Sequence, residues 1–309
     1  MAADSGVLLA EGWKFAGNAS ILLLMKTREL QRVITSIPAS DGAGVKLRRS
    51  IGGAPGLRHD PFLMLDEFFS DDPNDYLAGF PAHPHRGFET VTYMLDGHMQ
   101  HKDNHGNTGD LGPGDVQWMS AASGIIHSEM PQQAEGRMRG FQLWLNLPAK
   151  EKMRPAAYRD IASKEIPVLS LENVEVKLIA GKLKDKTAPI SGGSTDPYYF
   201  DVHLAPGAVF EAPIPSGHSG FIYLYEGEAL VGDERKPLAH RAAGLLSDGE
   251  KVRIESGKGA RALVLAGKPL REPVVQYGPF VMNTREEIEQ AVADYQSGDL
   301  ARSAIRTTL

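Results

Sequence analysis

Short apolar runs separated by tight-turn signals constrain the fold of this chain more than any other feature. Two strand-like runs cover residues 90–95 and 116–119, and the turn signals Asp96-Gly97, NHGN at 104–107 and GPGD at 112–115 lie between them. Asp-Gly favours the two-residue turn of a β-hairpin, because glycine adopts the positive φ that this turn requires. Repeated hairpins close into an antiparallel barrel. The sequence therefore predicts an all-β fold.

The length of 309 residues is more than a single core usually needs, so we expect two domains. Charge and proline increase at 148–155, where we place the start of a connector. This predicts a first barrel at 25–150 and a second barrel at 151–309. Residues 1–24 show no clear periodicity, and we expect a poorly ordered N-terminal appendage there.

One helix is predicted near the C-terminus. The segment from Thr284 to Glu287 has the form of a capping box, in which the first side chain and the fourth satisfy backbone N–H groups reciprocally. Apolar residues follow at helical spacing, and Gly298 is a typical stop. We expect this short C-terminal helix to close one end of a barrel.

Composition excludes several classes of function. The formal charge of −6 gives no overall attraction for phosphate backbones, so direct nucleic-acid binding is not expected. The chain contains no cysteine, which excludes disulfides, thiolate catalysis and cysteine-ligated metals. No apolar stretch approaches the length of a membrane span, and no signal peptide is recognised. These features predict a soluble cytoplasmic protein without membrane partners.

Two triplets, His83-Pro84-His85 and His127-Ser128-Glu129, carry the candidate chemistry. Both lie in strand-like stretches, where side chains two residues apart point to the same face. Each triplet therefore offers two metal ligands. Three imidazoles and a carboxylate inside a barrel are typical of a divalent first-row metal site, and open positions favour iron(II). Such groups buried without partners would each cost about 1–3 kcal/mol.

The chain resembles the pirin family over residue 28 to the C-terminus. The resemblance rests on four strings: HPHRGFETVTYMLDG at 83–97, GPGDVQWMSAASGIIHSEMP at 112–131, GFQLWLNLP at 140–148 and PVVQYGPFVMNT at 273–284. Pirins are bicupins, built of two tandem antiparallel β-barrels of the jelly-roll type, and they bind iron in the N-terminal barrel. The resemblance implies that His83, His85, His127 and Glu129 are the metal ligands.

The resemblance also implies an activity, since several pirins are quercetin 2,3-dioxygenases. We therefore expect a quercetin-like dioxygenase that uses iron(II), or another divalent transition metal, to cleave a flavonol with dioxygen and release carbon monoxide. A flavonol or another small aromatic molecule is the expected substrate. Glu129 is the candidate catalytic residue: it either holds the metal or takes the hydroxyl proton of the substrate as a general base.

A second class of function stays open at this point. Eukaryotic pirins are nuclear iron-dependent coregulators of transcription factors, which would make the metal site a redox sensor with a protein partner and a nuclear location. The sequence counts against this alternative, because it has no basic cluster beyond 46–49 to suggest nuclear import, and that cluster is more simply a solvated strand or loop face. A cupin acting on a different small organic substrate is a third alternative.

Other candidate residues receive more ordinary interpretations. A shift of 130 residues places Pro213 and Pro215 opposite His83 and His85, which predicts that the second barrel lacks metal ligands. Polar or core roles are favoured for the histidines of the second half, and surface positions for three histidines near the first hairpin: His203, His218, His240, His98, His101 and His105. Glu89 occupies the acidic position of the first cupin motif, and a pair with Arg86 or a surface position is slightly favoured for it.

Overall fold

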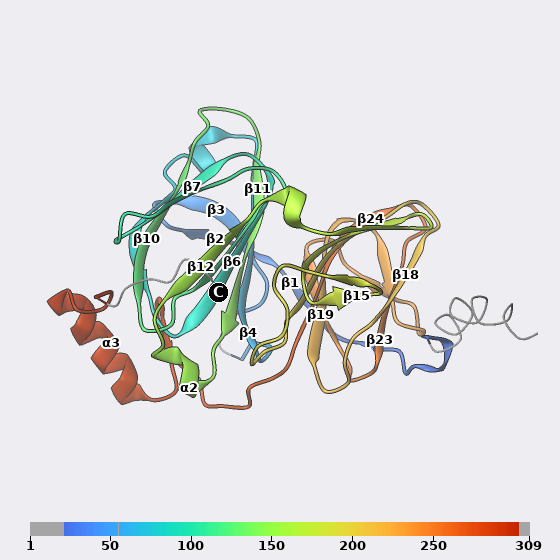
Figure 1. Ribbon diagram of the computed structural model, residues 1–309. Coiled ribbons are helices and arrows are strands. Elements are labelled where there is room, and N and C mark those ends of the chain that lie inside the picture. The colour runs from blue at the N-terminus through green and yellow to red at the C-terminus, as the bar shows by residue number, and fades with distance from the viewer. Residues whose placement is uncertain (1–21, 55, 303–309) are drawn as a thin grey trace, which may run out of the picture.

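The computed structural model describes residues 22–54 and 56–302, so most of the predicted appendage at 1–24 lies outside the described residues. The described chain forms two antiparallel β-barrels side by side (Figure 1), which confirms the all-β prediction. Each barrel combines a seven-stranded sheet with a four-stranded sheet. In the described part of the chain, no helix is long and apolar enough to cross a membrane.

The first barrel holds the predicted hairpins. Its seven-stranded sheet has the order β12 (Ala157–Ile161), β9 (Val116–Ser120), β6 (Phe88–Asp96), β11 (Met138–Asn146), β4 (Phe62–Ser70), β3 (Val45–Arg49) and β2 (Ile37–Asp41). Its four-stranded sheet has the order β5 (Phe80–His85), β10 (Ile125–Pro131), β7 (Met99–Asp103) and β8 (Thr108–Leu111). The turn predicted at Asp96-Gly97 joins β6 to β7, and Gly97 has a φ of +90°.

The second barrel repeats this design. Its seven-stranded sheet has the order β1 (Leu30–Thr35), β22 (Ala242–Leu246), β19 (Ser219–Gly227), β24 (Ala260–Gly267), β17 (Tyr198–Leu204), β14 (Val174–Ala180) and β13 (Val168–Leu171). The four-stranded sheet has the order β18 (Val209–Pro213), β23 (Lys251–Glu255), β20 (Ala229–Val231) and β21 (Lys236–Leu238). The remaining elements are β15 (Lys182–Leu183), β16 (Lys186–Thr187), β25 (Val275–Tyr277), β26 (Phe280–Met282), α2 (Ala149–Lys152), α3 (Arg285–Ser297), η1 (Pro73–Asp75) and η2 (Ser163–Glu165).

Strand pairing crosses the predicted division near residue 150 in both directions. Strand β1, from the N-terminal part, pairs with β22 of the second barrel. Strand β12, from beyond residue 150, pairs with β9 of the first barrel. The division into 25–150 and 151–309 therefore stays a prediction for the folding units, while each barrel receives one edge strand from the other side of this division.

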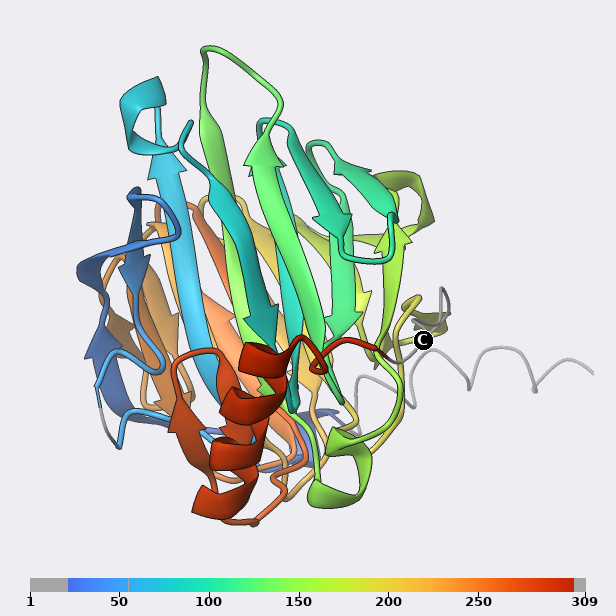
Figure 2. The ribbon, with the colours of Figure 1, turned by 90° about the vertical axis from the view of Figure 1, so that its left-hand side faces the viewer.

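The C-terminal segment returns to the first barrel. The prediction of a capped helix is confirmed: Thr284 accepts from the Glu287 N–H, Glu287 accepts from the Thr284 N–H, and Gly298 ends α3 with a φ of +79°. Helix α3 packs on β25 and β26 at the side of the first barrel (Figures 1 and 2). Arg86 donates to Asp294 on α3 over 2.7 Å. The helix thus covers the barrel that carries the histidine motif.

A single apolar cluster joins the two barrels. Outward-facing residues of β6 and β11, among them Val91 and Phe141, pack with Phe221, Tyr223 and Leu263 from the second barrel. Alternate residues on the same two strands point into the first barrel instead. The interior of the first barrel is therefore left for the candidate site.

Candidate metal centre

Three imidazoles converge inside the first barrel. His83 and His85 lie on β5, and His127 lies directly opposite His83 on β10. Their ring centroids are 4.4–4.9 Å apart, and one ligand atom from each ring lies within 4.8 Å of the others. Among the described residues, this is the one group of three or more potential ligands with this spacing. The structure brings these three predicted ligands together.

The position of β5 at the edge of its sheet explains how this sequence can form a strand. Proline has no N–H to donate and is tolerated at a sheet edge, and both Pro81 and Pro84 lie on β5. The edge is covered by the C-terminal segment, because the Arg86 N–H donates to the Pro279 carbonyl over 3.2 Å. The two halves of the chain therefore meet beside the histidines.

Hydrogen bonds and burial arrange the imidazoles as metal ligands. His83 Nδ1 lies 2.8 Å from the Pro81 carbonyl, which fixes the hydrogen on Nδ1 and leaves Nε2 as an acceptor. His83 Nε2 lies 2.9 Å from His85 Nε2. His127 Nε2 is buried and has no hydrogen-bond partner among the described residues. Burial holds the pKa values of His85 and His127 well below the ordinary value, and their histidine neighbours lower them further. This donor set fits a divalent transition metal.

Glu129 lies two residues beyond His127 and is also buried, at 2% exposure. Its Oε1 accepts from Thr92 Oγ1 over 3.0 Å, and its Oε2 accepts from Gln142 Nε2 over 3.0 Å. It is not part of the group of three imidazoles with mutual distances below 4.8 Å. The structure does not bring Glu129 into this group, and its role as the fourth ligand stays a prediction.

A fourth histidine, His101, belongs to this cluster. Its side chain is 1% exposed, and its Nδ1 lies 3.0 Å from His127 Nδ1. The surface position favoured for His101 from the sequence is therefore wrong. Alternation along β7 places Met99, His101 and Asp103 on one face. The sequence does not show whether this face points into the barrel, because that depends on how β7 pairs with β10. The other two histidines of this hairpin, His98 and His105, are not in the cluster.

A pocket of about 720 Å³ opens onto the histidines. His83, His85 and Gln142 are polar residues of its lining, and its apolar lining includes Phe68, Phe80, Leu63, Met64 and Trp144. Trp144 also packs against His85 with a centroid distance of 5.4 Å. The volume lies in the range of about 300–1,000 Å³ that is usual for small organic ligands. The arrangement suits a planar aromatic molecule beside His83 and His85.

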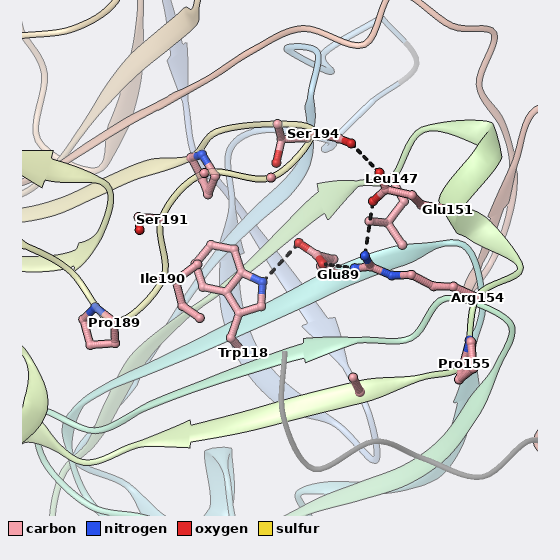
Figure 3. A pocket seen from close by; sticks show the side chains of 15 residues that line it. Glu89, Trp118, Leu147, Glu151, Arg154, Pro155, Pro189, Ile190, Ser191 and Ser194 are labelled. Atoms are coloured by element: carbon pink, nitrogen blue, oxygen red, sulfur yellow. Dashed lines mark hydrogen bonds and ion pairs between the residues drawn. The ribbon is translucent and has the colours of Figure 1, made fainter.

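Glu89 faces a different pocket, as Figure 3 shows. Its carboxylate accepts from Trp118 Nε1 over 3.1 Å and from Arg154 over 3.2 Å. Burial raises the pKa of Glu89, and its donors oppose this shift. Both interpretations favoured for Glu89 are therefore wrong: its side chain is buried and pairs with Arg154, whereas Arg86 pairs with Asp294. Trp118 is likewise turned away from the histidines, so neither side chain lines the metal centre.

The three histidines of the second half make separate hydrogen bonds. His203 lies 3.0 Å from the buried carboxylate of Asp201, and His218 lies 3.2 Å from Asp196. His240 lies 3.0 Å from the backbone carbonyl of Tyr225. These contacts agree with ordinary polar roles for all three.

Two tandem jelly-roll barrels with a candidate metal centre in the first define a bicupin protein. The family models for Pirin and for the Pirin C-terminal cupin domain match residues 44–145 and 199–301. The chain belongs to the pirin family.

Individual relatives cover nearly the whole chain. A Pseudomonas aeruginosa protein provisionally named quercetin 2,3-dioxygenase is 55% identical over 90% of this chain and 100% of its own. Human pirin is 44% identical over 85% of this chain and 91% of its own. The crystal structure of a quercetin 2,3-dioxygenase from Acinetobacter baumannii has a TM-score of 0.82 at 33% identity, and covers 90% of this chain and 99% of its own.

Proposed function

We propose that this protein is a metal-dependent dioxygenase that cleaves quercetin or a related flavonol, with iron(II) held by His83, His85, His127 and Glu129. The observation that carries this proposal is the convergence of three imidazoles, two of which, His83 and His85, line a pocket together with aromatic side chains. The relatives named as quercetin 2,3-dioxygenases support the substrate class. An iron(II) ion in this site would supply positive charge that acidifies a hydroxyl group of the substrate and would promote the reaction of the substrate with dioxygen.

The residues of the chain divide the remaining tasks. Trp144 and Phe68 provide apolar surface for the flat rings of the substrate. Glu129 accepts the proton of the flavonol 3-hydroxyl at a carboxylate oxygen, or serves as the fourth ligand. The donors Thr92 and Gln142 orient its carboxylate, since each bonds to a different oxygen. In the overall reaction both atoms of dioxygen enter the product depside, and one ring carbon leaves as carbon monoxide.

Turnover tests the proposal directly. The protein is reconstituted with iron(II) without oxygen and then exposed to oxygen and quercetin, and both the loss of flavonol absorbance and the release of carbon monoxide are followed. Turnover in the wild type and in His98→Ala, but not in His83→Ala, is the expected result. His98 is a suitable control because it lies on the same barrel and is exposed. Iron binding without consumption of any flavonol would overturn the substrate assignment.

The variant Glu129→Gln separates the two roles of the carboxylate. If Glu129 is a ligand, its loss is expected to weaken iron(II) binding by more than about 100-fold. This is more than the loss expected for a residue that only hydrogen-bonds to a ligand. Loss of a general base alone would leave binding nearly unchanged and reduce turnover by about 10²–10⁴-fold. Isothermal titration and steady-state kinetics on the same preparation distinguish these outcomes. We expect the first, because Glu129 lies two residues from His127 on one strand.

A further inference from the structure

His101 is buried in the histidine cluster, yet it lies behind His127 and not beside the other rings. Its Nδ1 is 3.0 Å from His127 Nδ1, and the two ring centroids are 4.9 Å apart. The two nitrogens of an imidazole lie on different edges of the ring. A residue bonded to Nδ1 of His127 is therefore placed away from Nε2, the atom that is buried without a partner.

We propose that His101 is a positioning residue: it accepts the Nδ1 hydrogen of His127 and so holds the Nε2 lone pair of His127 ready for a metal. This inference rests on the metal centre described under the proposed function. Two neutral imidazoles that meet through Nδ1 share one hydrogen, so only one of them can donate. If His127 donates, its Nε2 is bare. If His101 donates, the hydrogen of His127 lies on Nε2 and blocks the metal.

The same logic already holds for His83. Its Nδ1 donates to the Pro81 carbonyl over 2.8 Å, which leaves its Nε2, the nitrogen 2.9 Å from His85 Nε2, without a hydrogen. Metal-binding histidines usually donate their second nitrogen to a carboxylate, a carbonyl or water, and this bond sets the tautomer and orientation of the ring. In this chain the acceptor for His127 is another histidine.

The position of His101 is fixed by its strand. His101 lies opposite Glu129 in the pairing of β7 with β10, and opposite Gly109 in the pairing with β8. Its ring packs on Tyr158 with a centroid distance of 5.8 Å. His101 Nε2 is buried and has no partner in the part of the chain that the structure describes, so the hydrogen that this tautomer places there is the unfavourable part of the arrangement. Binding of a metal to His127 Nε2 requires this tautomer. The free energy of metal binding therefore offsets the cost of the unpaired hydrogen on His101.

Metal titrations with matched variants test the proposal, with cobalt(II) as the probe. His101→Phe keeps a flat ring but removes the acceptor, and is expected to weaken cobalt(II) binding by about 10–100-fold. His101→Asn places a carbonyl oxygen near the position of Nδ1, and is expected to bind within a few-fold of the wild type. His98→Phe, an exposed position at the same hairpin, is expected to bind like the wild type.

Nuclear magnetic resonance of the wild type reads the direction of the bond without any variant. In the zinc-loaded protein labelled with ¹⁵N-histidine, the shifts of His101 are expected to show a hydrogen on Nε2 and none on Nδ1. The opposite tautomer of His101, or undiminished cobalt(II) binding by His101→Phe, would overturn the proposal. Failure of the metal centre itself has a different signature, namely that His83→Ala binds cobalt(II) as tightly as the wild type.

Discussion

Lys152 is a charged side chain that the fold places in the interior. It is 1% exposed, and its three N–H donors find three acceptors: the carbonyls of Gly87 and Val281 at 2.6 and 3.0 Å and Asn146 Oδ1 at 2.7 Å. Burial lowers its pKa from 10.5 to about 8, and the charges of Glu272 and Glu287 partly oppose this shift. One side chain thus joins strand ends of the first barrel to the returning C-terminal segment.

This pKa gives a prediction for stability against pH. Between about pH 8 and pH 10.5 the unfolded chain carries a proton on Lys152 that the folded protein has lost, so the stability of the wild type relative to Lys152→Met rises with pH. The gain is at most about 1.4 kcal/mol per pH unit. Urea denaturation from pH 7 to 10.5 measures it. Lys150→Met, an exposed position on the same helix, is the control, and a pH-independent difference for Lys152→Met would contradict the prediction.

At the candidate site, sequence reasoning reached the residues that form short motifs. Alternation along a strand brings residues two apart to one face, which favours two pairs of ligands, His83 with His85 and His127 with Glu129. The resemblance to the pirin family implies the same four residues, and the structure brings the three histidines together. His101 could not be placed in this way, since its direction depends on the pairing of β7 with β10. Glu89 was similarly undetermined, because its partner Arg154 is 65 residues away in the sequence.

At the scale of elements, turn chemistry and capping were predictable because both depend on neighbouring residues. The hairpin at Gly97 and the helix from Arg285 to Ser297 follow from local signals. The pairing of β1 with the second barrel and of β12 with the first does not follow from local signals. Any edge strand with a suitable apolar face can pair with either sheet. The return of residues 278–282 alongside residues 85–88 does not follow from local signals either, because the residues in contact are nearly 200 positions apart in the sequence.

This return depends on Gly87. Gly87 has a φ of +92°, and a Cβ placed there would lie 1.9 Å from the Val281 carbonyl oxygen. We predict that Gly87→Ala lowers the free energy of unfolding by about 1–2 kcal/mol because alanine is strained at this positive φ. Steric overlap of its Cβ with the Val281 carbonyl oxygen is expected to lower it by about 1–3 kcal/mol more. Urea denaturation checks the sum.

Gly106→Ala separates the two contributions. Gly106 has a similar φ of +85°, but a Cβ there would meet nothing within 4 Å. Only the backbone cost of about 1–2 kcal/mol is expected for it. Equal losses in the two variants would show that the close approach of Val281 does not matter to stability.

At the scale of the whole molecule, the two barrels share structure that neither half completes alone. The shared apolar cluster contains residues from both seven-stranded sheets. The pocket beside the histidines is also composite, because Gln276, Gly278 and Pro279 line it together with strands of the first barrel. We therefore expect the barrels to unfold together, and the metal centre to be lost with either.

A buried hydrogen bond across the barrels makes this coupling measurable. Tyr93 on β6 donates to Asp201 on β17 over 2.7 Å, and both residues are fully buried. Tyr93→Phe removes a donor to a charged group and is predicted to lower the free energy of unfolding by about 1.5–3 kcal/mol. The unfolding transition, followed by circular dichroism in urea, is expected to stay single. Tyr199→Phe is the matched control, because the Tyr199 hydroxyl is buried without a partner and its removal should cost nothing. Two separate transitions, or equal effects of the two variants, would show that the barrels are not coupled through this bond.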